Sequence, residues 1–336
     1  MKIYFATNRR PSPLTKPKNF GREFNPDGAS VIRFGYAVVK GNRVDIKVAP
    51  EKLSPDKNGY SLDLDKSRLG SQKIFNQARK TMKTRCKDTL IFIHGYNVSF
   101  KNALKTAAQI AQNLQAVKHS NGVDVALFSW PSDGSMKPFL AYASDRRDAA
   151  ASGPAVARSF LMFYQFLTNI LKEEECDQHV HLMCHSMGNY VLRHALQEFI
   201  RQSSERIPRL FDQIFLMAPD EDDDAFEHKH KLLLLPKLGR RVNVYFNRND
   251  RAMSISDFTK SNPERLGDDG PRLPFQIPSK IVQIDCTSVV RGIVEHNYYK
   301  DTPKVVADIV STLDGIEPEE IPNRKFIEDK NRYRLI

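Results

Sequence analysis

The sequence predicts an α/β protein with a mostly parallel central sheet, helices on both of its faces and an antiparallel hairpin at one edge. Three observations lead to this class. From about residue 85 onward, short apolar runs alternate with helical patterns. Turn residues bound most of the runs, as in strands that are buried on both faces. Near the N-terminus, two further runs flank a short Gly-Asn turn.

The alternating region contains six expected strands, which are brief runs rich in Val, Ile, Leu and Phe. They are Thr89–Ile93, Val123–Ser129, Val180–Cys184, Gln213–Met217, Val242–Phe246 and Lys280–Asp285. Because a helical pattern separates most consecutive strands, the chain crosses back over the sheet and the strands run parallel. The N-terminal hairpin pairs Val31–Val39 with Arg43–Val48 at the edge of the sheet.

Three helices have recognisable ends. Ser99 is the expected cap of the first, whose apolar residues recur at helical spacing as far as residue 114. Residues 187–200 carry a second apolar stripe. The third helix begins at Thr302, has a proline in its first turn and stops at Gly315.

A chain of 336 residues suits one large α/β domain, which we expect over residues 1–316, with residues 1–50 as its N-terminal edge strands. Residues 131–152 and 261–279 are extra segments that could form a partial lid. Residues 317–336 are polar and are expected to form a tail on the surface.

The chain carries 51 Lys and Arg against 40 Asp and Glu, a net charge of +11. Residues 1–50 hold ten basic and three acidic residues and so contribute +7 of this charge. Such a region could make weak contact with an anionic surface, although an ordinary solvated face is the simpler explanation. No nucleic-acid-binding motif accompanies the charge, so we expect no specific nucleic-acid partner.

The sequence has no apolar run near the roughly 18 residues of a spanning helix, and its N-terminus lacks the apolar segment of a secretory signal. Its four cysteines lack the paired spacing of zinc ligands. We therefore expect a cytoplasmic protein with free thiols, without a metal or other cofactor.

The run at Val180–Cys184 continues into His185-Ser-Met-Gly188 and then directly into a helix. This strand–serine–helix turn resembles the nucleophile elbow of the α/β-hydrolase superfamily, although Cys184 stands where that motif has its first glycine. Ser186 would project its hydroxyl above the sheet, and Gly188 would relieve crowding where the helix begins. The alternative is that Ser186 only caps the helix.

A second motif, His94-Gly-Tyr-Asn97, follows the strand Thr89–Ile93. In the superfamily a turn at this place supplies half of the oxyanion hole. The resemblance thus implies the backbone N–H of Tyr96 as one donor and that of Met187, after the nucleophile, as the other. A turn in which His94 is purely structural is the alternative.

The superfamily places an acid and then a histidine after the serine. Of the histidines that follow Ser186, only His296 lies in the loop between the last strand and the terminal helix, the superfamily's place for the base. Two acids end strands: Asp250, and Asp220 one strand earlier at the head of an acidic run. We expect Asp250 to orient His296 and keep Asp220 as the alternative acid.

Together with these motifs, Ala6-Thr-Asn-Arg9, Phe128-Ser-Trp-Pro-Ser132 and Ala218-Pro-Asp220 resemble one bacterial subfamily of α/β-hydrolases of unknown function. The resemblance implies the α/β-hydrolase fold and a serine esterase or lipase-like enzyme. Such an enzyme would cleave carboxylic esters of small molecules or lipids through an acyl-enzyme on Ser186.

A catalytically inactive protein of the same fold, binding an anionic partner or a membrane surface, is the alternative function. His94, Asn97 and Trp130 are candidate pocket residues, and core packing is an equally good explanation for Trp130, the one tryptophan of the chain. Tyr142 and Asp145 could also face the site, but we expect them on a helical surface.

Overall fold

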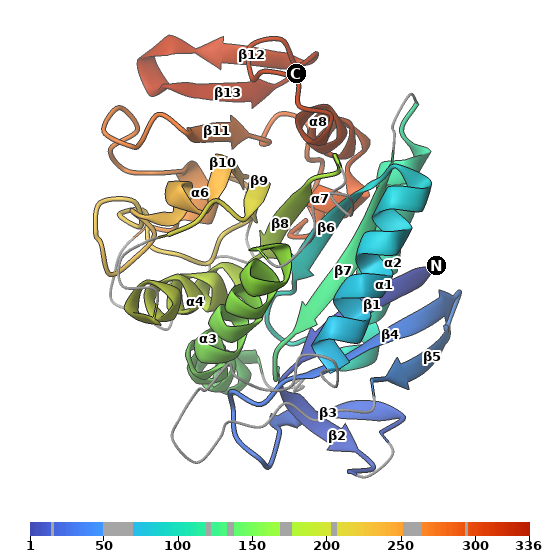
Figure 1. Ribbon diagram of the computed structural model, residues 1–336. Helices are drawn as coiled ribbons and strands as arrows, with labels where there is room; N and C mark the ends of the chain where they lie inside the picture. The colour runs from blue at the N-terminus through green and yellow to red at the C-terminus, as the bar shows by residue number, and fades with distance from the viewer. Residues whose placement is uncertain are drawn as a thin grey trace.

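A central sheet crosses the molecule and separates its helices into two layers (Figure 1). The computed structural model describes residues 1–14, 17–49, 70–118, 122–132, 138–168, 177–202, 207–250, 264–292 and 295–336. Within these residues the strands of the sheet, in spatial order, are β12 (Arg324–Ile327), β13 (Arg332–Leu335), β11 (Ile281–Asp285), β10 (Gly239–Phe246), β9 (Phe211–Met217), β8 (Val180–His185), β6 (Asp88–Ile93), β7 (Val123–Ser129), β1 (Lys2–Thr7), β4 (Arg33–Lys40) and β5 (Arg43–Val48).

Neighbouring strands from β13 through β1 are parallel. The strands β4, β5 and β12 are antiparallel to the strands beside them. Near the N-terminus, β2 (Arg9–Ser12) and β3 (Asn19–Phe24) form a small second sheet. The predicted class, a mostly parallel sheet with an N-terminal antiparallel hairpin, is confirmed.

Helices cover both faces of the sheet (Figure 1). They are α1 (Gly70–Arg85), α2 (Phe100–Ala116), α3 (Pro138–Thr168), α4 (Gly188–Gln202), α6 (Leu266–Asp269), α7 (Tyr298–Asp301) and α8 (Pro303–Leu313), with short 3₁₀ turns η3 (Leu235–Lys237) and η4 (Glu328–Lys330). No helix among the described residues combines the length and apolarity needed to cross a membrane.

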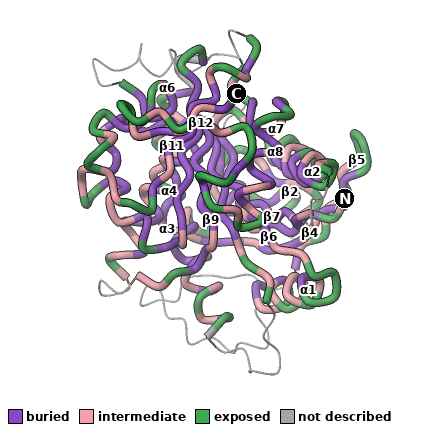
Figure 2. The backbone as a smooth tube through the Cα atoms, turned by 90° about the horizontal axis from the view of Figure 1, so that it is seen from above, coloured by how far each residue is buried: buried purple, intermediate pink, exposed green. Residues whose placement is uncertain are grey.

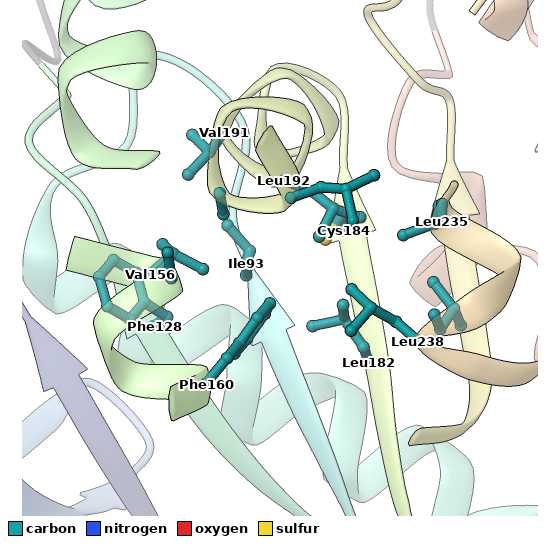
Figure 3. Close-up of a cluster of buried hydrophobic side chains, with 14 of the residues drawn as sticks. Ile93, Phe128, Val156, Phe160, Leu182, Cys184, Val191, Leu192, Leu235 and Leu238 are labelled. Carbon is teal, nitrogen blue, oxygen red and sulfur yellow. The ribbon is translucent and has the colours of Figure 1, made fainter. Parts of the chain in front are cut away.

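Two apolar cores follow from the alternation of side chains along the strands. In β6, Leu90 and Phe92 pack in the core that contains α2 and α8, whereas Ile93 belongs to the core that contains α3 and α4. Figure 3 shows Val191 and Leu192 of α4 in this second core. Figure 2, coloured by burial, shows that the buried residues gather at the strands in the centre of the molecule.

Residues 1–50 were expected to form edge strands, but β1, at their start, lies inside the sheet between β7 and β4. Its apolar run is only Ile3-Tyr-Phe-Ala6, and a run this short carries little periodic signal. Its place depends on pairing with a strand more than a hundred residues away in the chain.

Residues 317–336, expected to be a surface tail, instead add β12 and β13 to the sheet, where β13 pairs with β11. Arg324 explains the difference, because its guanidinium reaches into the core and pairs with Asp308 of α8 at 2.7 Å. One charged residue of this polar segment is therefore buried in an ion pair and does not face solvent.

The proposed lid segment 131–152 contains the first half of α3, which packs along α4. Tyr142 and Asp145, expected on the helical surface, are both buried. This helix could not be predicted from the sequence because Gly153 and Pro154 interrupt its helical pattern of apolar residues. Residues 133–137 and 261–263 lie outside the described residues, and 264–279 contain α6 with the loop that follows it.

Candidate active site

The turn between β8 and α4 is strained at its centre. Ser186 has a φ of 52°, a region that residues other than glycine rarely occupy and that often marks a functional position. Two hydrogen bonds of 2.9 Å hold it there, from the Ser186 N–H to the Met217 carbonyl and from the Asn189 side chain to the Ser186 carbonyl. Ser186 consequently lies at the carboxyl end of the parallel strands, where α/β folds place their ligands.

Two glycines let the end of β6 lie directly against this turn. A Cβ atom at Gly95 would be 2.9 Å from the Cβ of Ser186, and one at Gly188 would be 2.6 Å from the Ile93 carbonyl oxygen. Either side chain would collide with its neighbour. Tyr96 and Met187, the two predicted oxyanion donors, therefore belong to segments that touch each other beside the serine.

His296 and Asp250 meet although 46 residues separate them in the chain. The His296 Nδ1 lies 2.7 Å from Asp250 Oδ2, which assigns the ring proton to Nδ1 and leaves Nε2 as an acceptor. The Asp250 side chain is fully buried, whereas 17% of the His296 side chain is exposed. The imidazole thus has a buried anionic partner behind it and an accessible side in front.

His185, the residue before Ser186, ties the histidine loop to the elbow. Its Nε2–H donates to the His296 carbonyl at 3.0 Å, and its ring centroid lies 4.6 Å from that of His296. Burial and the neighbouring His296 hold the pKa of His185 well below its usual value, so this ring is neutral. Tyr298 lies two residues after His296. Its hydroxyl donates to the Tyr245 carbonyl at 2.9 Å and anchors the histidine loop to β10.

Asp220 has different partners. Its carboxylate accepts from the Tyr142 hydroxyl at 2.8 Å and lies 3.7 Å from both Arg146 and Arg265. Its backbone N–H donates to the Ser186 carbonyl at 3.2 Å. Asp220 therefore supports the elbow through its main chain, while its side chain belongs to a buried network with cations.

A buried polar cluster holds the loop after β6. Asp145 of α3 accepts from the Asn97 N–H at 2.8 Å and from the Ser132 hydroxyl at 2.7 Å. The Val98 N–H in turn donates to Ser132 at 3.1 Å, and the Val98 carbonyl accepts from Arg9 at 2.6 Å. Burial lowers the pKa of Arg9 to about 9, an effect that the charge of Asp145 opposes. Both groups clamp the loop that carries Tyr96.

A comparison with known protein families gives a match that covers most of the chain. The family described as "Alpha/beta hydrolase of unknown function (DUF900)" matches residues 70–313, which include Ser186, Asp250 and His296. This chain belongs to that family. The DUF900 match thereby confirms the expected α/β-hydrolase fold.

Two individual proteins are similar to this DUF900 chain. An uncharacterized protein of Nostoc sp. (strain PCC 7120) is 24% identical over 98% of each chain. The structure of a hyperthermophilic esterase from the archaeon Pyrobaculum calidifontis is 11% identical, with a TM-score of 0.36, over 68% of this chain and 77% of that one. A similarity at this TM-score does not bear on what the DUF900 chain does.

Two of the other candidate pocket residues, His94 and Trp130, are buried against each other, whereas Asn97 is exposed. Trp130 is fully buried, stacks on the His94 ring and donates its indole N–H to the His94 carbonyl at 2.8 Å. Burial and the charge of Arg9 lower the pKa of His94 to about 3, so this imidazole is neutral. Asn97 is exposed at a φ of 59°, a conformation that asparagine tolerates well.

From the sequence alone Asp145 was expected on a helical surface, and His185 and Arg9 were noted only as members of the motifs that contain them. The available signal for Arg9 was an arginine two residues beyond the apolar strand β1. A charge at that place is unusual because the carboxyl ends of central strands are buried or line a site.

Proposed function

We propose that this protein is a serine hydrolase that cleaves carboxylic esters through Ser186, His296 and Asp250. The observation that carries the proposal is the 2.7 Å contact between His296 Nδ1 and Asp250, on a loop that His185 ties to the strained turn at Ser186. A base oriented by a buried carboxylate, on a loop tied to a strained serine turn, is the arrangement that nucleophilic catalysis requires.

In the proposed reaction the Ser186 Oγ attacks the ester carbonyl carbon while His296 Nε2 takes the hydroxyl proton. The N–H groups of Tyr96 and Met187 stabilise the oxyanion, each by about 3 kcal/mol in the transition state. The C–O bond to the alcohol breaks, the alcohol leaves with the proton from His296, and the acyl group stays on Ser186. Water then repeats the sequence and releases the acid.

A fluorophosphonate probe tests this proposal, because it reacts with an activated serine and not with an inert one. We expect labelling at Ser186 and turnover of p-nitrophenyl butyrate. The Ser186→Ala variant should lose both, with turnover lower by more than about 10⁴-fold and thermal stability maintained. A matched control, Ser311→Ala on the distant helix α8, should keep both.

Labelling at another serine would refute the assignment of Ser186. A folded protein without labelling or turnover would instead favour the alternative of an inactive hydrolase fold that binds an anionic partner.

A further inference from the structure

A cavity of about 330 Å³ lies within the layer formed by α1, α3 and the sheet. Its walls are almost entirely apolar and include Phe34, Phe75, Ile91, Ala126, Phe128 and Phe160. Phe128 and Phe160 are labelled in the view of this core in Figure 3. Water is poorly held in such a space because few polar groups can bond to it, whereas apolar molecules bind there readily.

The cavity is separate from the proposed catalytic site. Its lining on the sheet comes from residues within the strands, such as Ile91 of β6 and Ala126 of β7, whereas Ser186 and His296 follow strand ends. Neither Ser186 nor His296 lines the cavity. A ligand held here would therefore occupy the middle of the sheet face rather than the carboxyl ends of the strands.

The helix over the cavity is strongly basic. It contains Lys73, Arg79, Lys80, Lys83 and Arg85 and no acidic residue. The helix turns Ile74, Phe75, Ala78 and Met82 toward the cavity, whereas its lysines are exposed. Arg79 itself lines the cavity, as do the polar residues Gln178 and Thr89. An apolar interior beside a cationic helix suits a molecule with a hydrocarbon chain and an anionic head.

We propose that this cavity binds the chain of a single-chain anionic amphiphile, with the head group beside Arg79. Benzene fits an apolar cavity of about 150 Å³, so the present volume has room for about twelve carbon atoms. A fatty acid of that length is the simplest such ligand, and an anionic lipid offering one chain from a bilayer is the other source.

Calorimetric titration of the full chain with dodecanoate, below its micelle concentration, tests the proposal. We expect saturable one-to-one binding with a negative heat-capacity change, the mark of buried apolar surface. Dodecanol and dodecyltrimethylammonium should bind at least tenfold more weakly because they lack the anionic head. Butyrate should not bind measurably. Equal affinity for all three twelve-carbon ligands, or no saturable binding, would overturn the proposal.

Two substitutions locate the ligand. Ala126→Phe projects a ring into the cavity and should weaken dodecanoate binding at least tenfold while raising the melting temperature, because it fills the space. If this variant does not fold, Ala78→Leu makes the same test from the helix side. Unchanged dodecanoate affinity in a folded filling variant would show that the ligand lies elsewhere and would overturn the proposal.

Charge reversal tests the head group. Arg79→Glu should weaken dodecanoate at least tenfold but leave dodecanol unaffected. Its control, Lys101→Glu, makes the same charge change at an exposed position of α2 and should not alter dodecanoate binding. Equal effects of the two variants would mean general electrostatic attraction only and would contradict a defined site.

Two further measurements distinguish a free fatty acid from a bilayer lipid and the cavity from the catalytic site. Cosedimentation with phosphatidylglycerol vesicles, but not phosphatidylcholine vesicles, with loss in Arg79→Glu, identifies a bilayer lipid as the source. Binding of dodecanoate alone identifies the free acid. The Ser186→Ala variant should bind dodecanoate normally, since the proposal does not depend on catalysis. Loss of binding in that variant would place the chain in the catalytic site and refute the separate cavity.

Discussion

At the scale of single residues, His296 is held from several directions. Asp250 accepts from its Nδ1, His185 donates to its carbonyl, and Tyr298 fixes the following turn to the end of β10. Each contact comes from a different segment at the carboxyl ends of the parallel strands. The orientation of the imidazole therefore depends on the relative placement of β8, β10 and the segment after β11.

The acid can be assigned by comparing two carboxylates. Asp250→Asn should lower kcat by about 10³- to 10⁴-fold with little change in KM, because the neutral partner favours the wrong imidazole tautomer. Asp220→Asn should lower kcat less and the melting temperature more, since it leaves buried Arg265 with less compensating charge. Steady-state kinetics and thermal melts of equally pure variants check both statements. The reverse ranking of kcat would move the acid to Asp220.

Asp145 is expected to act through the loop that carries Tyr96. Asp145→Asn weakens the bond to the Asn97 N–H and removes the negative charge that acts on Arg9, so we expect kcat to fall by about ten- to a hundredfold at unchanged KM. Asp329→Asn, at an exposed position, is the control. A fall in stability without any change in kcat of the folded enzyme would show that the clamp does not reach the oxyanion donor.

At the scale of elements, the contact of α3 with α4 depends on one glycine. A Cβ atom at Gly153 would lie 2.6 Å from the Cβ of His194 on α4. The helices can approach this closely only because Gly153 has no side chain. This contact sets the position of α3 and, through it, that of Tyr142 and Asp145.

Gly153→Leu should therefore lower the free energy of unfolding by about 1–3 kcal/mol or more, through overpacking between the two helices. Urea denaturation followed by circular dichroism measures the change. Ala151→Leu adds a comparable side chain at an exposed position of the same helix and should have little effect. Equal free energies of unfolding for the two variants would contradict the close packing of α3 on α4 at Gly153.

At the scale of the whole molecule, the C-terminal strands close one edge of the sheet. Their anchor is the Arg324–Asp308 pair, whose side chains are 1% and 2% exposed. The Tyr245 hydroxyl also donates to Asp308 at 2.5 Å, so the anchor joins β10, α8 and β12. The end of the chain is thus integrated with the core that lies behind the candidate site.

Asp308→Ala should destabilise the protein by about 3–5 kcal/mol, because it leaves a buried arginine without its partner. Chemical denaturation gives the difference, and Glu319→Ala, at an exposed position, is the control. An unchanged denaturation midpoint in Asp308→Ala would show that the Arg324–Asp308 pair does not anchor the C-terminal strands.

The amino-acid sequence alone predicted the features that arise from local patterns. The strand endings, the cap at Ser99 and the turn at Ser186 depend on residues near one another in the chain, so they can be predicted without a structure. The order of Ser186, Asp250 and His296 along the chain was legible for the same reason.

Contacts between distant segments were decided only by the tertiary structure. It showed that Asp250 rather than Asp220 meets the ring of His296, and that Arg9 and Asp145 reach the loop after β6. It also placed β1 inside the sheet and brought residues 317–336 onto its edge. The physical reason is that strand pairing and burial of charge depend on which partners the fold brings together, and no local pattern encodes that choice.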